Sequence, residues 1–131
     1  MNSWQAALAV AAGGGAGSLL RYGVTIAVAQ RLGPGFPWWT LAINVTGSFA
    51  IGVVAEMTQT RALWATPVLR TFLMAGVLGG YTTFSTFSLD ALTLAGDRAA
   101  LLAAAYVVAS VGFGIAAAFS GIALARALSL P

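Results

Sequence analysis

The stretch VLGGYTTFSTFSLDA, residues Val77–Ala91, combines two properties that rarely occur together in one segment. It overlaps a run without any charged residue, Thr71–Leu89, yet five of the seven side chains in Thr82–Ser88 carry a hydroxyl group. Glycine and threonine are poor helix formers. The stretch therefore predicts a helix that is interrupted, within a segment hydrophobic enough to be buried.

The composition of the whole chain indicates that its surroundings are lipid. Of 131 residues, 60% are hydrophobic and only 7% are charged, whereas a soluble domain carries about 25% charged residues. Six basic and three acidic side chains are too few to cover a soluble surface, which argues against a soluble enzyme. The chain has no cysteine and no histidine, so metal sites and catalysis that need either residue are also excluded.

The charged residues leave four uncharged runs of 19, 24, 19 and 27 residues. A transmembrane helix needs about 20 residues. We therefore predict a single all-α transmembrane domain over residues 1–131, with four helices and short loops. The expected helices lie near residues 4–30, 38–56, 68–94 and 99–128.

Basic residues are distributed almost evenly over the two sides that four spans define. One side holds Arg61, Arg70 and Arg126. The other side holds Arg31 and Arg98, and also Arg21 if its side chain extends toward that side. Membrane orientation follows the asymmetry of Lys and Arg between the two sides. A chain without this asymmetry could insert in both orientations, which points to a dimer of opposed subunits. The alternative is that the basic residues of this small protein are evenly distributed over the two sides by chance.

The second expected span carries Thr40, Asn44 and Ser48 at a spacing of four residues, which places them on one helical face. Asn44 lies close to the middle of its uncharged run. An amide at that depth is costly without hydrogen-bond partners. Two interpretations stay open. The Asn44 amide either forms a structural hydrogen bond between helices or donates its N–H groups to a species that is transported through the protein.

The fourth expected span carries a similar series, Tyr106, Ser110 and Gly114. One hydroxyl series in a helix is common, because serine can bond the carbonyl four residues before it. Two such series in so short a chain favour a polar track through the protein.

The uncharged run of the third span is centred on Gly80. A helix interrupted there frees backbone groups, which are tolerated at membrane depth only inside protein or beside a polar cavity. The carbonyl end of the first half-helix is a natural cation site. A kink satisfied by hydroxyl groups is the alternative. Phe84 and Phe87 share a face of the second half, with core packing as their default role.

The first expected span contains an arginine and a glycine pair. Gly13 and Gly17 form a GxxxG pair, as do Gly76 and Gly80 in the third span, and such pairs suit close helix contact in lipid. Arg21 has no acidic partner in its own span. It either extends to a lipid headgroup or lines a wet vestibule and attracts anions.

Three segments resemble the Fluc, or CrcB, family of small bacterial fluoride channels. They are GGGAGSLLRY (13–22), TLAINVTGSFAIG (40–52) and GVLGGYTTFSTFSLD (76–90). The resemblance covers essentially the full length. It implies a dual-topology homodimer of antiparallel subunits in the bacterial cytoplasmic (inner) membrane, with the third of four helices broken near mid-membrane. It also implies passive export of cytoplasmic fluoride, which relieves fluoride toxicity, and no contact with nucleic acid.

The resemblance further implies which residues line two fluoride pathways along the subunit interface. The family's pathway residues match Asn44, Phe84, Phe87, Tyr106 and Ser110. We add the nearby hydroxyl groups of Thr40, Ser48, Thr83 and Ser85, and place Arg21 at a vestibule. A structural sodium ion (Na+) at the dimer axis is implied to bind the backbone carbonyls of Gly79 and Thr82. Gly114 stands where some members have a second serine.

Two other classes of protein remain as alternatives. Small multidrug exporters also have four spans and are often of dual topology, but they resemble proton antiporters with an essential glutamate in the first span. This chain has no acid before Glu56, at the end of the second span, and we expect no buried acidic residue for proton coupling. A small subunit of a larger membrane complex would show no ion flux alone.

Overall fold

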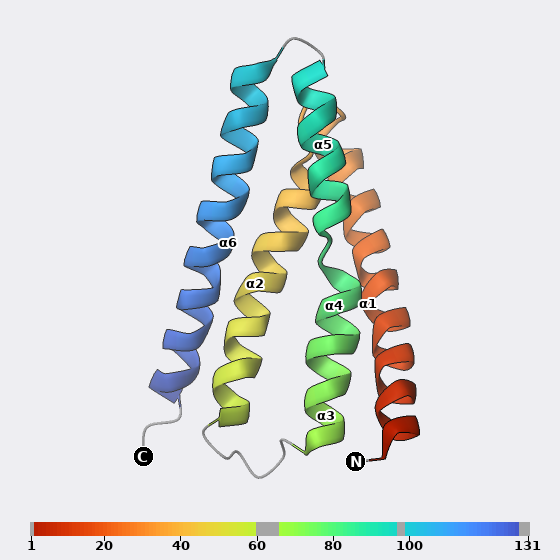
Figure 1. Cartoon of the computed structure of the whole chain (residues 1–131). Helices are drawn as coiled ribbons and strands as arrows, with labels where there is room; N and C mark the ends of the chain where they lie inside the picture. Colours follow the sequence, from red (N-terminus) through yellow and green to blue (C-terminus); the bar gives the residue numbers. More distant parts are fainter. Residues whose placement is uncertain (1, 60–65, 97–98, 129–131) are drawn as a thin grey trace.

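The structure, a computed structural model, describes residues 2–59, 66–96 and 99–128. Within these ranges all regular structure is helical (Figure 1), which confirms the prediction of an all-α fold. The three long helices are α1 (Ser3–Leu32), α2 (Trp38–Gln59) and α6 (Ala100–Leu128). They begin and end within three residues of the expected bounds. Arg61 and Arg98, on which the charge balance depends, lie outside the described residues.

The third helical segment consists of several pieces. They are α3 (Pro67–Thr71), the π-helix η1 (Phe72–Leu78), α4 (Gly79–Tyr81) and α5 (Phe84–Gly96). Thr66 caps the beginning, since its side chain accepts a hydrogen bond from the Leu69 backbone N–H. Between α4 and α5, Thr82 and Thr83 are not helical, and Thr82 is extended with ψ 159°. The expected span of 68–94 thus contains a two-residue interruption, visible in Figure 1 between α4 and α5.

The outer surface of the helices is strongly apolar. Large apolar side chains are exposed on every long helix, for example Leu19 on α1, Phe49 on α2 and Leu101 on α6, the last at 86%. Apolar patches of this extent are not stable against water. On length and composition, α2 and α6 are each able to cross a membrane.

Helix α1 packs against η1 and α4 through glycines of both segments (Figure 1). A Cβ atom on Gly13 would lie 2.5 Å from the Phe72 carbonyl oxygen, and one on Gly80 would lie 2.5 Å from the Gly14 carbonyl oxygen. A Cβ on Gly17 would overlap the Val77 carbonyl. The two GxxxG pairs therefore meet each other, which confirms their expected role in close helix contact.

Helices α2 and α6 form the second close pair (Figure 1). Gly52 lies against the Ala118 carbonyl and Gly121 against the Phe49 carbonyl, so both helices approach backbone to backbone. At one end Arg126 Nε lies 3.0 Å from Glu56 Oε1. Glu56 is only 7% exposed. The sequence analysis expected no buried acidic residue for proton coupling and did not foresee the burial of Glu56, whose charge an arginine on the neighbouring helix compensates.

Gly17→Ala is expected to destabilise the protein, because the new methyl group meets the backbone of η1 rather than a movable side chain. Overpacking of this kind costs about 1–3 kcal/mol. Thermal unfolding in detergent micelles measures the effect. Gly15→Ala is the matched control, since open space surrounds Gly15. Equal melting temperatures for the two variants would contradict the packing described above.

Candidate functional site

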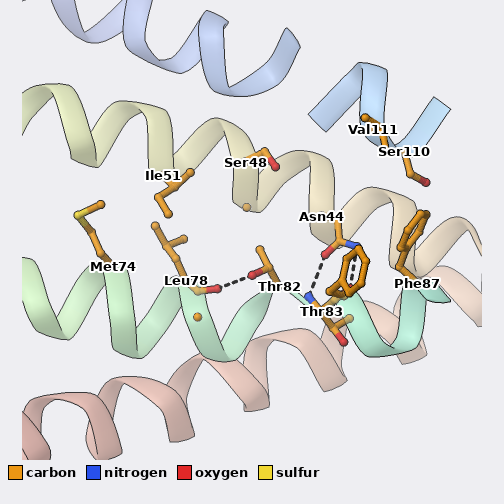
Figure 2. A pocket seen from close by; sticks show the side chains of 13 residues that line it. Asn44, Ser48, Ile51, Met74, Leu78, Thr82, Thr83, Phe87, Ser110 and Val111 are labelled. Atoms are coloured by element: carbon orange, nitrogen blue, oxygen red, sulfur yellow. Dashed lines mark hydrogen bonds between the residues drawn. The ribbon is translucent and has the colours of Figure 1, made fainter. Parts of the chain in front are cut away.

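The interruption between α4 and α5 is held by Asn44 of α2. Asn44 Nδ2 donates to the Thr83 carbonyl at 3.0 Å, and the Thr83 backbone N–H donates to Asn44 Oδ1 at 2.9 Å (Figure 2). Because Thr83 presents one donor and one acceptor, only one orientation of the amide satisfies both. The structural interpretation of Asn44 is thus realised, and one of its two N–H groups remains for another acceptor.

Thr83 also determines where α5 begins. Its Oγ1 accepts a hydrogen bond from the Thr86 backbone N–H at 3.3 Å, the pattern of a helix N-cap. The Thr86 hydroxyl lies 3.0 Å and the Ser85 hydroxyl 3.3 Å from the same oxygen. The hydroxyl-rich sequence therefore supplies the polar groups that an interrupted helix needs.

Thr82 closes the preceding helix. Its backbone N–H and its Oγ1 both donate to the Leu78 carbonyl, at 3.0 Å and 2.9 Å. Within the described residues, its own carbonyl accepts a single long contact, of 3.4 Å, from Arg21 Nη1. Arg21 is half-buried, so its guanidinium points toward the interruption rather than away from the protein.

A pocket of about 370 Å³ lies beside the interruption, lined by residues of α2, η1, α4, α5 and α6 (Figure 2). Of the expected pathway and sodium-site residues, those that line it are Asn44, Ser48, Gly79, Thr82, Thr83, Phe84, Phe87 and Ser110. Those that do not are Thr40, Ser85, Tyr106 and Arg21. Apolar side chains complete the wall, and the sequence analysis missed them: Ile51, Met74, Leu78 and Val111.

Ser110 is the one buried side chain of the described residues whose polar atom has no hydrogen-bond partner in the protein. Its hydroxyl borders the pocket (Figure 2). A buried hydroxyl without a partner is costly, so its presence calls for an explanation. Nearby, a Cβ on Gly114 would lie 3.5 Å from Ser48 Oγ, an ordinary contact distance. Gly114 thus faces Ser48 and has room for a small side chain.

Phe84 and Phe87 form an aromatic pair at the mouth of the pocket. Their ring centroids are 5.6 Å apart with a tilt of 45°. Phe84 is 79% exposed, so core packing is the wrong default for this residue. Phe87 packs on Tyr106 with a centroid distance of 5.4 Å. Phe84 therefore presents its ring to whatever surrounds this subunit.

A carboxylate network lies behind Phe87. Thr40 Oγ1 donates to Asp90 Oδ2 at 2.6 Å, and the buried Tyr106 hydroxyl donates to the same oxygen at 3.3 Å. The sequence analysis did not select Asp90. A signal was present, because Thr83, Phe87 and Asp90 follow at spacings of four and three and so share one helical face.

Residues 8–122 match the family described as CrcB-like protein, Camphor Resistance (CrcB). The chain belongs to the CrcB family. A CrcB-family relative from Rhizobium meliloti (strain 1021), named "Fluoride-specific ion channel FluC", is 54% identical over 92% of this chain and 96% of its own. A relative of the same name from Agrobacterium fabrum is 50% identical over 91% and 94%.

A third CrcB-family relative, "Fluoride-specific ion channel FluC 1" from Nitrobacter hamburgensis, is 48% identical over 95% of this chain and 98% of its own. These relatives are named as channels and not as enzymes. Nothing in these comparisons supports the multidrug exporter alternative. Together with the apolar helices α2 and α6, membership of the CrcB family identifies a membrane protein.

Ser110→Ala is expected to separate stability from transport. The change removes a buried hydroxyl that lacks a protein partner. The free energy of unfolding is therefore expected to stay unchanged or to rise by about 1 kcal/mol. Fluoride efflux from liposomes is expected to fall, because the pocket loses a donor. Ser120→Ala, which removes an exposed hydroxyl bonded to the Ala116 carbonyl, is the matched control. A fall in stability with full efflux would mean that the hydroxyl serves the fold instead.

Proposed function

We propose that this chain is a passive fluoride-selective channel that exports cytoplasmic fluoride and so relieves its toxicity. The observation that carries the proposal is a pocket edged by neutral donors, one of them the unpartnered Ser110 hydroxyl, in a chain 54% identical to a protein named as a fluoride-specific channel. Among the described residues that line the pocket there is no acid and no base. Such a lining offers no carboxylate for proton coupling and no charged group for tight binding of an ion.

The donors of the pocket suit a small, strongly hydrated anion. Fluoride leaves water only where other donors replace its hydration shell. Ser48 and Ser110 each supply one O–H, and Asn44 supplies the single N–H that Thr83 leaves free. The ring edges of Phe84 and Phe87 carry partial positive charge and attract an anion weakly. Weak attraction of this kind permits release, which conduction requires.

We further propose that the working unit is an antiparallel homodimer, with multi-pass subunits in the inner membrane. Phe84 is exposed beside the pocket, so one subunit alone leaves the pathway without a complete wall. A second, inverted copy would supply that wall, and the near-even spread of arginines permits the inversion. The helix interruption would then lie near mid-membrane, facing its counterpart.

The proposed sodium site fits the backbone at the interruption. In a continuous helix the Gly79 carbonyl would accept from the Thr83 N–H, and the Thr82 carbonyl from the Thr86 N–H. Here Thr83 donates to Asn44, and Thr86 donates to the Thr83 side chain. Both carbonyls therefore lack these donors. Neutral oxygen ligands suit a hard cation, and bound Na+ would supply positive charge at the dimer axis.

Purified protein in liposomes tests the proposal. Fluoride-loaded vesicles should release fluoride rapidly after a potassium ionophore is added, whereas chloride-loaded vesicles should retain chloride. Retention of both ions, or release of both at equal rates, would contradict a fluoride-selective channel.

Phe84→Ile extends the same assay to the pathway. The side chain is largely exposed, so its loss should leave folding intact, while a barrier raised by about 1.4 kcal/mol would slow fluoride about tenfold. Phe119→Ile is the matched control, because Phe119 is similarly exposed on α6. Equal slowing of fluoride efflux in Phe84→Ile and Phe119→Ile would contradict a specific role of Phe84.

A further inference from the structure

Tyr81, the last residue of α4, and Thr83, in the interruption that follows, contact α2 from two opposite sides. On one side Asn44 binds the backbone of Thr83. On the other, the Tyr81 hydroxyl lies 2.9 Å from Thr46 Oγ1. Thr46 follows Asn44 by two residues, which is about 200° around a helix. Tyr81 and Thr83 therefore straddle α2, with Thr82 between them.

Gly47 makes this arrangement possible. A Cβ at Gly47 would overlap the Thr82 methyl group and would lie 3.3 Å from Tyr81 Cδ1. The Thr82 side chain has little freedom to turn aside, because its Oγ1 donates to the Leu78 carbonyl. The interruption thus lies directly on the backbone of α2.

The donors at Thr46 and Tyr81 can be assigned. Thr46 Oγ1 lies 2.7 Å from the Ala42 carbonyl, its shortest acceptor. A threonine hydroxyl has a single proton, and Thr46 donates it in the hydrogen bond to the Ala42 carbonyl. The Tyr81 hydroxyl is therefore the donor to Thr46 Oγ1. Neither residue lines the pocket, and the proposed conduction pathway gives the pair no role.

We propose that Tyr81 and Thr46 are positioning residues that fix the direction of the Thr82 carbonyl. Thr82 lies between two anchored neighbours, Tyr81 on one side of α2 and Thr83 on the other. With both ends held, the peptide that carries the carbonyl cannot rotate freely. The inference rests on the proposed function, in which this carbonyl binds the cation at the dimer axis. It adds an anchor to the one that Asn44 provides and to the long contact of 3.4 Å that Arg21 Nη1 makes with the Thr82 carbonyl.

Tyr81→Phe and Thr46→Val each remove one hydroxyl and keep the shape of the side chain. Fluoride efflux, normalised to folded dimer, is expected to fall about two- to tenfold in each, the effect of losing one neutral hydrogen bond. The double variant should be no slower than the slower single variant, because both changes remove the same interaction. Thr46→Ser keeps the hydroxyl and should conduct as the native protein does.

Two variants serve as matched controls. Tyr22→Phe changes an exposed tyrosine on α1, and Thr93→Val removes an exposed hydroxyl that is bonded only within α5, to the Leu89 carbonyl. Both should conduct normally. If Thr46→Ser slows efflux as much as Thr46→Val, the methyl packing matters rather than the hydroxyl, and the proposal is overturned.

Hydrogen–deuterium exchange of the backbone amides in residues 79–84, measured in lipid nanodiscs, gives a readout that does not depend on conduction. Exchange should become faster in Tyr81→Phe and Thr46→Val and stay unchanged in the two controls. Faster exchange in Tyr81→Phe and Thr46→Val, together with a native protein that conducts no fluoride, would uphold the positioning role and refute the proposed function. Unchanged exchange together with unchanged efflux would refute the positioning role alone.

Discussion

The paired hydrogen bonds between the Asn44 amide and the Thr83 backbone are the interaction on which the site depends. They give Thr83 the donor and acceptor that a continuous helix would otherwise provide. Once Thr83 is bound to α2, its side chain is free to cap α5. The face of α5 that follows then presents Phe87 toward the pocket and Asp90 toward Thr40 and Tyr106.

Glycine packing holds this interaction in place from both sides. The contact of α1 with η1 and α4 has backbone against backbone, so the half-helix before the interruption has little room to shift. The contact of α2 with α6 is equally close and places Ser110 of α6 at the pocket that Asn44 of α2 also lines (Figure 2). In lipid, where apolar side chains gain nothing by meeting each other, such close contacts are a main source of helix association.

The sequence alone predicted the helical fold, the approximate bounds of the long helices and the contact-forming glycines, because these follow from local composition and spacing. It also selected Asn44, Ser110 and the hydroxyl-rich stretch. It did not identify the partner of Asn44, which lies 39 residues away, or the roles of Asp90, Thr46 and Tyr81. Such pairs depend on how the helices pack, and no local pattern contains that information. Burial of Glu56 was missed for the same reason, since its partner Arg126 is on another helix.

The central claim is that α2 holds Thr82 and Thr83 out of helical geometry inside the membrane. Solid-state NMR of the protein in lipid bilayers, with ¹³C-labelled threonine, tests it most directly through the Cα and Cβ chemical shifts of these residues. The account predicts extended-type shifts for Thr82 in the native protein, and a change in them when Asn44 is replaced by leucine. Helical shifts for Thr82 in the native protein would contradict it.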